Sequence, residues 1–90
     1  MIDIIQQITI DTRKTRGMTL EKFTDAINEL MPDKVTYSLI SHWEHGTRSP
    51  TLVRMDLMTR VYPAGDWRHD FAAAMIEALS STSVTPEPAG

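Results

Sequence analysis

The chain has 90 residues, of which 41% are hydrophobic, with no cysteine and a net charge of −3. The absence of cysteine excludes a disulfide framework and a thiolate metal site. A chain of this size builds one small core without a large substrate pocket, so we expect a single domain that is not an enzyme. The longest apolar run, residues 71–76, is too short to cross a membrane, and no secretion signal is present, which favours a cytoplasmic protein.

Helical spacing of apolar residues dominates the chain and strand-like alternation is absent, so we expect an all-α protein. The first helix should end at Gly17, a residue type that commonly terminates helices in a left-handed conformation. Thr19 is a suitable N-cap for the second helix. That helix should stop near Leu30, because Pro32 disfavours helical dihedrals at the residue before it.

Thr36 should cap a third helix that runs to about His45 and is ended by Gly46. On a helical wheel the apolar side chains of this segment fall on one arc, which must face the core: Leu39, Ile40 and Trp43. The opposite arc carries aromatic and small polar side chains: Tyr37, Ser38, Ser41, His42 and His45. Such side chains read base edges in a DNA groove, although an ordinary surface helix shows the same periodicity.

A fourth helix should open at residues 49–51. Its apolar face is formed by residues at three- and four-residue steps: Leu52, Met55, Met58 and Tyr62. A break at residues 63–65 separates it from a fifth helix, which Asp66 caps and which should reach about Ser80. Residues 81–90 have the composition of a disordered tail. We therefore expect five short helices.

The segment from Ile40 to Pro50 reads I-S-H-W-E-H-G-T-R-S-P. It resembles the I-S-x-W-E-x-G-x-R-x-P segment of Cro and phage-repressor-type helix-turn-helix proteins. Residues 13–23 are similar to the R-x-x-x-G-(L/M)-T passage that joins the first two helices of those proteins. The likeness covers residues 4–62, and it implies a compact five-helix bundle of the lambda-repressor-like type over residues 1–80. Such proteins bind operator DNA as dimers, with the third helix in the major groove.

The resemblance also implies site residues, position by position. Family members contact base edges from the positions that match Tyr37, Ser38 and His42. Ser41 lies on the same face of the helix. Four others match phosphate-contacting positions at the start of the second helix and after the third: Thr19, His45, Thr47 and Arg48. Family members further pair an arginine of the first helix with an acidic residue of the third, which here are Arg13 and Glu44.

The chain departs from the family pattern at several positions. Thr24 stands where the family usually has alanine, and Thr9 and Thr12 occupy positions of the first helix that are generally apolar. About six extra residues separate the second and third helices, so a longer connection around residues 31–34 replaces the usual tight turn. The crossing of these two helices is therefore expected to differ from the common one.

The predicted fifth helix has more apolar surface than a core of four helices should cover, because small and aliphatic residues widen its stripe. We therefore predict a homodimer formed through residues 66–80. The expected contact residues recur at three- and four-residue steps: Trp67, Phe71, Ala74, Met75 and Leu79.

Two functions remain open. The leading one is sequence-specific binding of double-stranded DNA by a small transcriptional regulator that has no cofactor and no evident small-molecule ligand. The alternative is a protein-interaction module of antirepressor or antitoxin type on the same fold. The net charge of −3 favours this alternative, although residues 66–90 hold the whole excess. We expect no metal site, because His42 and His45 supply only two ligands.

Overall fold

The computed structural model describes residues 3–84, which form five α-helices and no strand. The helices are α1 (Ile4–Thr15), α2 (Leu20–Asn28), α3 (Tyr37–His45), α4 (Leu52–Val61) and α5 (Trp67–Val84). The prediction of an all-α chain is therefore confirmed. Residues 81–84 continue α5 beyond its predicted end near Ser80, and the rest of the predicted disordered tail, residues 85–90, lies outside the described residues.

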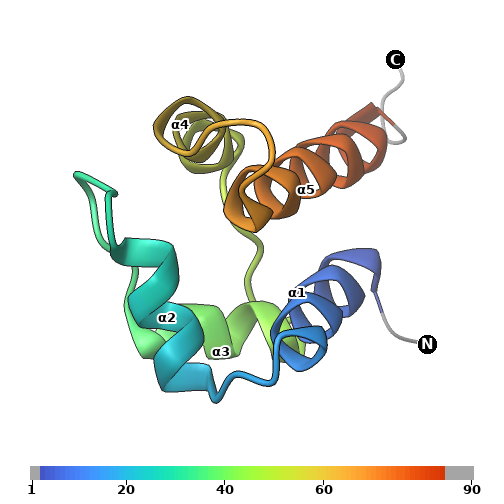
Figure 1. Cartoon of the computed structure of the whole chain (residues 1–90). Coiled ribbons are helices and arrows are strands. Elements are labelled where there is room, and N and C mark those ends of the chain that lie inside the picture. Colours follow the sequence, from blue (N-terminus) through green and yellow to red (C-terminus); the bar gives the residue numbers. More distant parts are fainter. Residues whose placement is uncertain (1–2, 85–90) are drawn as a thin grey trace.

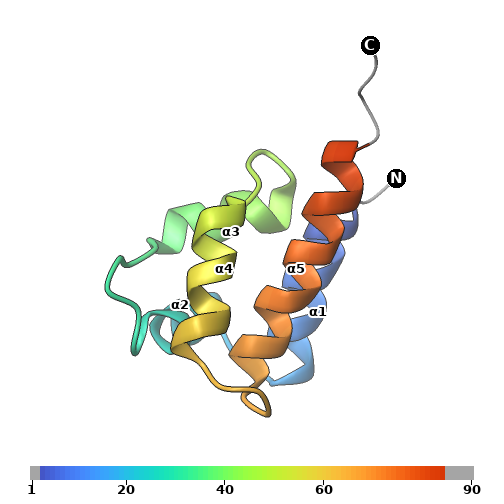
Figure 2. The same cartoon turned by 90° about the horizontal axis from the view of Figure 1, so that it is seen from above.

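The helices form two layers (Figure 1). The lower layer contains α1, α2 and α3, and α3 packs against both of the others. The upper layer contains α4 and α5, which lie side by side when seen from above (Figure 2). Because α5 also packs along α1, it joins the two layers. No helix within residues 3–84 is long and apolar enough to cross a membrane.

Local capping explains where the helices of the lower layer begin and end. The Thr19 hydroxyl accepts the backbone N–H of Lys22, and the Thr36 hydroxyl accepts the N–H of Leu39, so each satisfies a free donor in a first turn. Gly46 ends α3 in the left-handed conformation, with φ of 75°. These three predicted caps are confirmed, whereas α2 ends two residues earlier than predicted, at Asn28.

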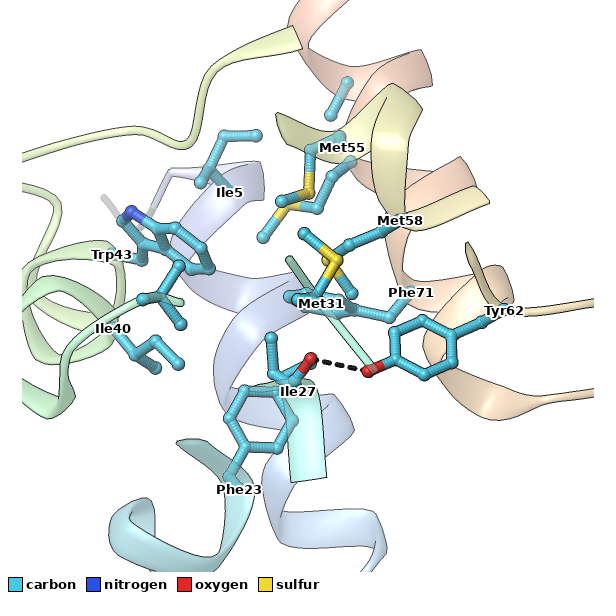
Figure 3. Close-up of a cluster of buried hydrophobic side chains, with 14 residues drawn as sticks. Ile5, Phe23, Ile27, Met31, Ile40, Trp43, Met55, Met58, Tyr62 and Phe71 are labelled. Carbon is cyan, nitrogen blue, oxygen red and sulfur yellow. Dashed lines mark hydrogen bonds between the residues drawn. The ribbon is translucent and has the colours of Figure 1, made fainter. Parts of the chain in front are cut away.

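The core fills the space between the two layers (Figure 3). Its completely buried apolar side chains come from α2, α3, α4 with the residue that follows it, and α5: Phe23, Ile27, Ile40, Trp43, Met55, Met58, Tyr62, Ala72 and Met75. The Tyr62 hydroxyl donates to the Ile27 carbonyl and accepts the Leu30 N–H, which ties the end of α4 to the end of α2. Leu52 does not belong to this face, because it begins α4 at the rim of the core and is 44% exposed.

The polar residues that depart from the family pattern are accommodated within their own helices. Thr9 is completely buried, and its hydroxyl donates to the Ile5 carbonyl at 2.8 Å. Thr24 is buried as well, and its hydroxyl donates to the Leu20 carbonyl at 2.8 Å. A buried hydroxyl costs little when it is hydrogen-bonded, so the two threonines do not disturb the packing of α1 and α2.

The long connection between α2 and α3 has a fixed conformation. The Asn28 side chain donates to the Val35 carbonyl and accepts the Val35 N–H, both at 2.8 Å. The Lys34 ammonium donates to the Asn28 carbonyl at the end of α2 and to the Met31 carbonyl within the connection, and the Met31 side chain is buried in the core. Arg54 of α4 holds Asp33 through its backbone and carboxylate oxygens. These contacts determine where α3 begins.

Candidate functional site

The two sides of α3 differ in the way the sequence predicts. Ile40 and Trp43 are completely buried in the core, so the helix is anchored along one side. The other side is accessible: Tyr37, Ser38, His42 and His45 are exposed, and Ser41 is half-buried. We call these five residues the α3 face. The structure brings all five together on one surface.

An ion pair holds α3 against α1. Arg13 Nε lies 2.6 Å from Glu44 Oε2, and Arg13 Nη2 donates to Glu44 Oε1 at 3.1 Å, which forms a two-bond fork. The third guanidinium nitrogen donates to the Met18 carbonyl, so the α1–α2 connection joins the same cluster. The hydrogen bonds to Glu44 raise the pKa of Arg13. Because both side chains are largely buried, at 21% and 10% exposure, the fork restrains the orientation of α3.

Gln6, which was not among the predicted site residues, makes a second contact that holds the end of α3. Its amide nitrogen donates to the Glu44 carbonyl at 3.3 Å, and its oxygen accepts the Asp3 N–H in a capping box. The positive φ of Gly46 favours glycine, and a Cβ atom there would lie 2.7 Å from Gln6 Cδ, so a larger residue would displace the Gln6 side chain. The spacing of Asp3 and Gln6 was the available signal, since it is typical of a capping box.

The two histidines of the α3 face are held through the same ring nitrogen. His42 Nδ1 lies 2.6 Å from the Thr47 hydroxyl oxygen, and His45 Nδ1 lies 2.8 Å from the Ser41 carbonyl oxygen. Within residues 3–84, Nε2 of neither ring has a hydrogen-bond partner, so it is the nitrogen available to a ligand. No group of three metal-ligating side chains gathers in this part of the chain.

The predicted phosphate-contacting residues differ in the hydrogen bonds and the charge that their side chains can still offer to a ligand. The Thr19 and Thr47 hydroxyls already make hydrogen bonds within the chain, although each oxygen keeps further capacity. Arg48 is exposed, and its guanidinium makes no ion pair among the described residues. Arg48 is therefore the clearest candidate for an interaction with an anion.

Two carboxylates that were not among the predicted site residues lie beside the start of the α3 face. A shallow hollow between α2 and α3 is lined by Glu21, Thr24, Asp25, Asn28, Val35 and Tyr37. Glu21 and Asp25 are exposed and one helical turn apart, so they give this edge a negative charge. Their four-residue spacing on a predicted helix was the signal.

The predicted dimer contact on α5 needs a correction. Phe71 is 3% exposed and Met75 is completely buried, because α5 packs against α1 on one side and α4 on another. Both belong to the core of one chain and leave almost no surface for a partner. Trp67, Ala74 and Leu79 are half-buried. Trp67 packs on Phe23 with ring centroids 5.5 Å apart, and the Arg16 guanidinium covers it at 4.8 Å.

A groove between α1 and α5 keeps some apolar surface open. It consists of two adjoining hollows that share Ile8 and Ala74. Ile4 lines one end and is 54% exposed. Acidic residues from both helices stand along the groove: Asp11, Asp70 and Glu77. The groove thus combines an apolar floor with a charged rim.

No protein family model, curated protein or solved structure matches this chain. An assignment of function therefore depends on the chemistry of the surfaces described above.

Proposed function

We propose that the chain is a sequence-specific double-stranded DNA-binding protein, a small transcriptional regulator of the lambda-repressor-like helix-turn-helix type. In this proposal α3 is the recognition helix and the α3 face enters the major groove. One observation carries the proposal: the face presents short polar side chains on a helix whose opposite side is anchored by Ile40 and Trp43. The Arg13–Glu44 fork supports it by holding that helix in one orientation.

The dimensions of α3 suit this role. Nine residues give a helix of about 13 Å, and a major groove about 12 Å wide admits one α-helix. Tyr37 and Ser38 lie in the first turn, from which recognition helices contact base edges. Serine and histidine can both donate and accept hydrogen bonds, so they read several bases with modest discrimination. Arg48 follows the helix and is suited to a backbone phosphate.

We further propose that the protein binds as a homodimer through the groove between α1 and α5. A two-fold contact would bury Ile4 and Ile8 of α1 against the same residues or against α5 of the second copy. Trp67, Ala74 and Leu79 are the residues of the predicted contact that keep accessible surface. Two recognition helices about 34 Å apart would then reach successive major grooves and supply affinity that one weakly basic surface cannot.

One observation favours the alternative, a protein-interaction module. Glu21 and Asp25 stand beside Tyr37, at an edge that would approach phosphates if α3 entered a groove. Like charges repel there, whereas a basic protein partner would be attracted.

Selection of bound sequences from a random duplex library separates the two functions. The DNA-binding proposal predicts recovery of an inverted repeat, together with an affinity that falls steeply as salt is raised, because phosphate contacts release counterions. Arg48→Ala should flatten this salt dependence for all sequences alike. A library that returns no enriched sequence, with weak binding that salt does not change, would contradict DNA recognition and leave the protein-interaction module.

A further inference from the structure

The turn after α3 brings Thr47 back against the helix. Gly46 is left-handed, with φ of 75°, and the Thr47 N–H donates at 3.0 Å to the carbonyl of His42, five residues earlier. A continuing α-helix would instead bond each N–H four residues back, so this reversal belongs to the helix end. The Gln6 side chain of α1 lies against Gly46 and supports the turn. Thr47 therefore has a fixed place beside His42.

The side chains of these two residues meet at the α3 face. The Thr47 hydroxyl oxygen lies 2.6 Å from Nδ1 of His42 and 3.4 Å from the His42 carbonyl oxygen. Because the imidazole is attached at Cβ and held at Nδ1, its rotation about the side-chain bonds is restrained. The Thr47 contact therefore sets the direction of Nε2, the ring nitrogen that is available to a ligand.

This contact restrains the direction of Nε2 without choosing its chemistry. A hydroxyl can donate to Nδ1 or accept from it, so either tautomer of the His42 ring is satisfied. Nε2 is then an acceptor in one tautomer and a donor in the other. Base edges in the major groove carry both kinds of group. Thr47 thus decides where the ring can reach, and the base that it meets decides which tautomer pairs with it.

We infer that Thr47 is a positioning residue for base recognition, which acts through His42 and is not itself a phosphate contact. The inference rests on the proposed DNA-binding function and names a residue that determines its specificity. The hydroxyl is already engaged with two atoms of His42, and the next residue, Arg48, carries the charge that suits a phosphate. A ring nitrogen that is misdirected leaves a group on the base edge unpaired, so loss of the hydroxyl costs specificity.

The test compares the affinity of the full chain for the duplex recovered by selection and for duplexes in which single base pairs of that site are changed. His42→Ala should lower the preference by about fivefold or more at one or two base pairs. Thr47→Val keeps nearly the shape of threonine without the hydroxyl, and should lower the preference at the same base pairs by about two- to tenfold. The double variant should match His42→Ala, because Thr47 acts only through that ring.

Two further variants serve as controls. Thr47→Ser keeps a hydroxyl on the same backbone position and should retain the wild-type preference. Thr59→Val removes a hydroxyl that donates to the Asp56 carbonyl on α4, so it makes the same chemical change away from α3 and should also retain the preference.

The outcomes separate this inference from the function on which it rests. If Thr47→Val weakens binding to all duplexes alike, and does so equally when His42 is already alanine, then Thr47 contacts phosphate and the inference is overturned. A Thr47→Val variant with the wild-type preference, or a Thr47→Ser variant that loses as much as Thr47→Val, overturns it as well. In each of these cases sequence-specific binding by the wild type stands. A wild-type protein without any sequence preference overturns both.

Discussion

The α3 face and the groove between α1 and α5 are built in opposite ways, although α1 contributes to the support of both. Figure 1 shows α3 and α5 packed on different sides of α1. The α3 face has short polar side chains, and the helix beneath it is fixed by an ion-pair fork. The groove has an apolar floor that includes Ile4 and Ala74, with carboxylates at its rim.

Because of this difference, the two surfaces are suited to different kinds of partner. Hydrogen-bonding atoms discriminate between partners only when their directions are fixed, because a misdirected donor is left unpaired. The fork and Gln6 supply that restraint at α3. Apolar contact has no direction, so the groove needs only a complementary surface such as a second copy of itself. The two surfaces therefore fit recognition and assembly respectively.

The largest expected effect comes from breaking the fork. Glu44 is 10% exposed, so Arg13→Met leaves a carboxylate largely buried without its partner, and Glu44→Gln leaves the guanidinium in the same position. Each single variant should lower the free energy of unfolding by about 2–3 kcal/mol, somewhat less than for a fully buried pair. Chemical denaturation of both single variants and of the double variant measures this. Small losses that simply add would show that the two side chains are independent.

A smaller effect is expected from altering the groove without touching the α3 face. Ile4→Glu places a charge on an exposed part of the groove floor, so the monomer should remain folded while the dimer weakens by about tenfold or more. Val53→Glu is the matched control, since Val53 is 81% exposed on α4 and does not line the groove. Sedimentation velocity over a concentration series measures the self-association of each variant. Equal behaviour of both variants and the wild type would refute the proposed contact.

The smallest effect concerns a second arginine cluster, which joins α5 to α2. Hydrogen bonds from the Arg68 guanidinium and backbone lower the pKa of Asp66 from 3.8 to about 2. The ionised carboxylate therefore stabilises the fold above about pH 4, and this contribution is lost as pH falls toward 2. Thermal unfolding should show that Asp66→Asn is less stable than the wild type at neutral pH and that the difference narrows in acid. A constant difference across that range would contradict the pairing. DNA preference at neutral pH should not change.

Local signals in the sequence predicted much of this architecture. The N-caps at Thr19 and Thr36 and the glycine terminator at Gly46 act within a few residues of themselves, so they could be located without a three-dimensional structure. The helical wheel of α3 likewise separated the buried positions from the exposed ones, because side chains on the same face of a helix share the same environment.

The features that sequence missed depend on contacts between distant segments. The burial of Phe71 and Met75 follows from α5 packing against two helices, which periodicity within α5 does not reveal. The last turn of α5 continues past residue 80 beside the start of α1, where Ser81 and Ile4 line one hollow. Gln6 reaches a carbonyl 38 positions away. In each of these cases the structure depends on a distant segment of the chain that packs against the residues, and not on their local composition.

The most direct test of the central claim, that the α3 face reads DNA, is a comparison of sequence preference between α3-face variants and the wild type. Ser38→Ala and His42→Ala should each change the preference by about 1–3 kcal/mol at one or two base pairs of the selected site. Ser80→Ala and His69→Ala are matched controls on α5 and should keep the wild-type preference. If the double variant at residues 38 and 42 binds the selected site and random DNA as the wild type does, then α3 is not the recognition helix.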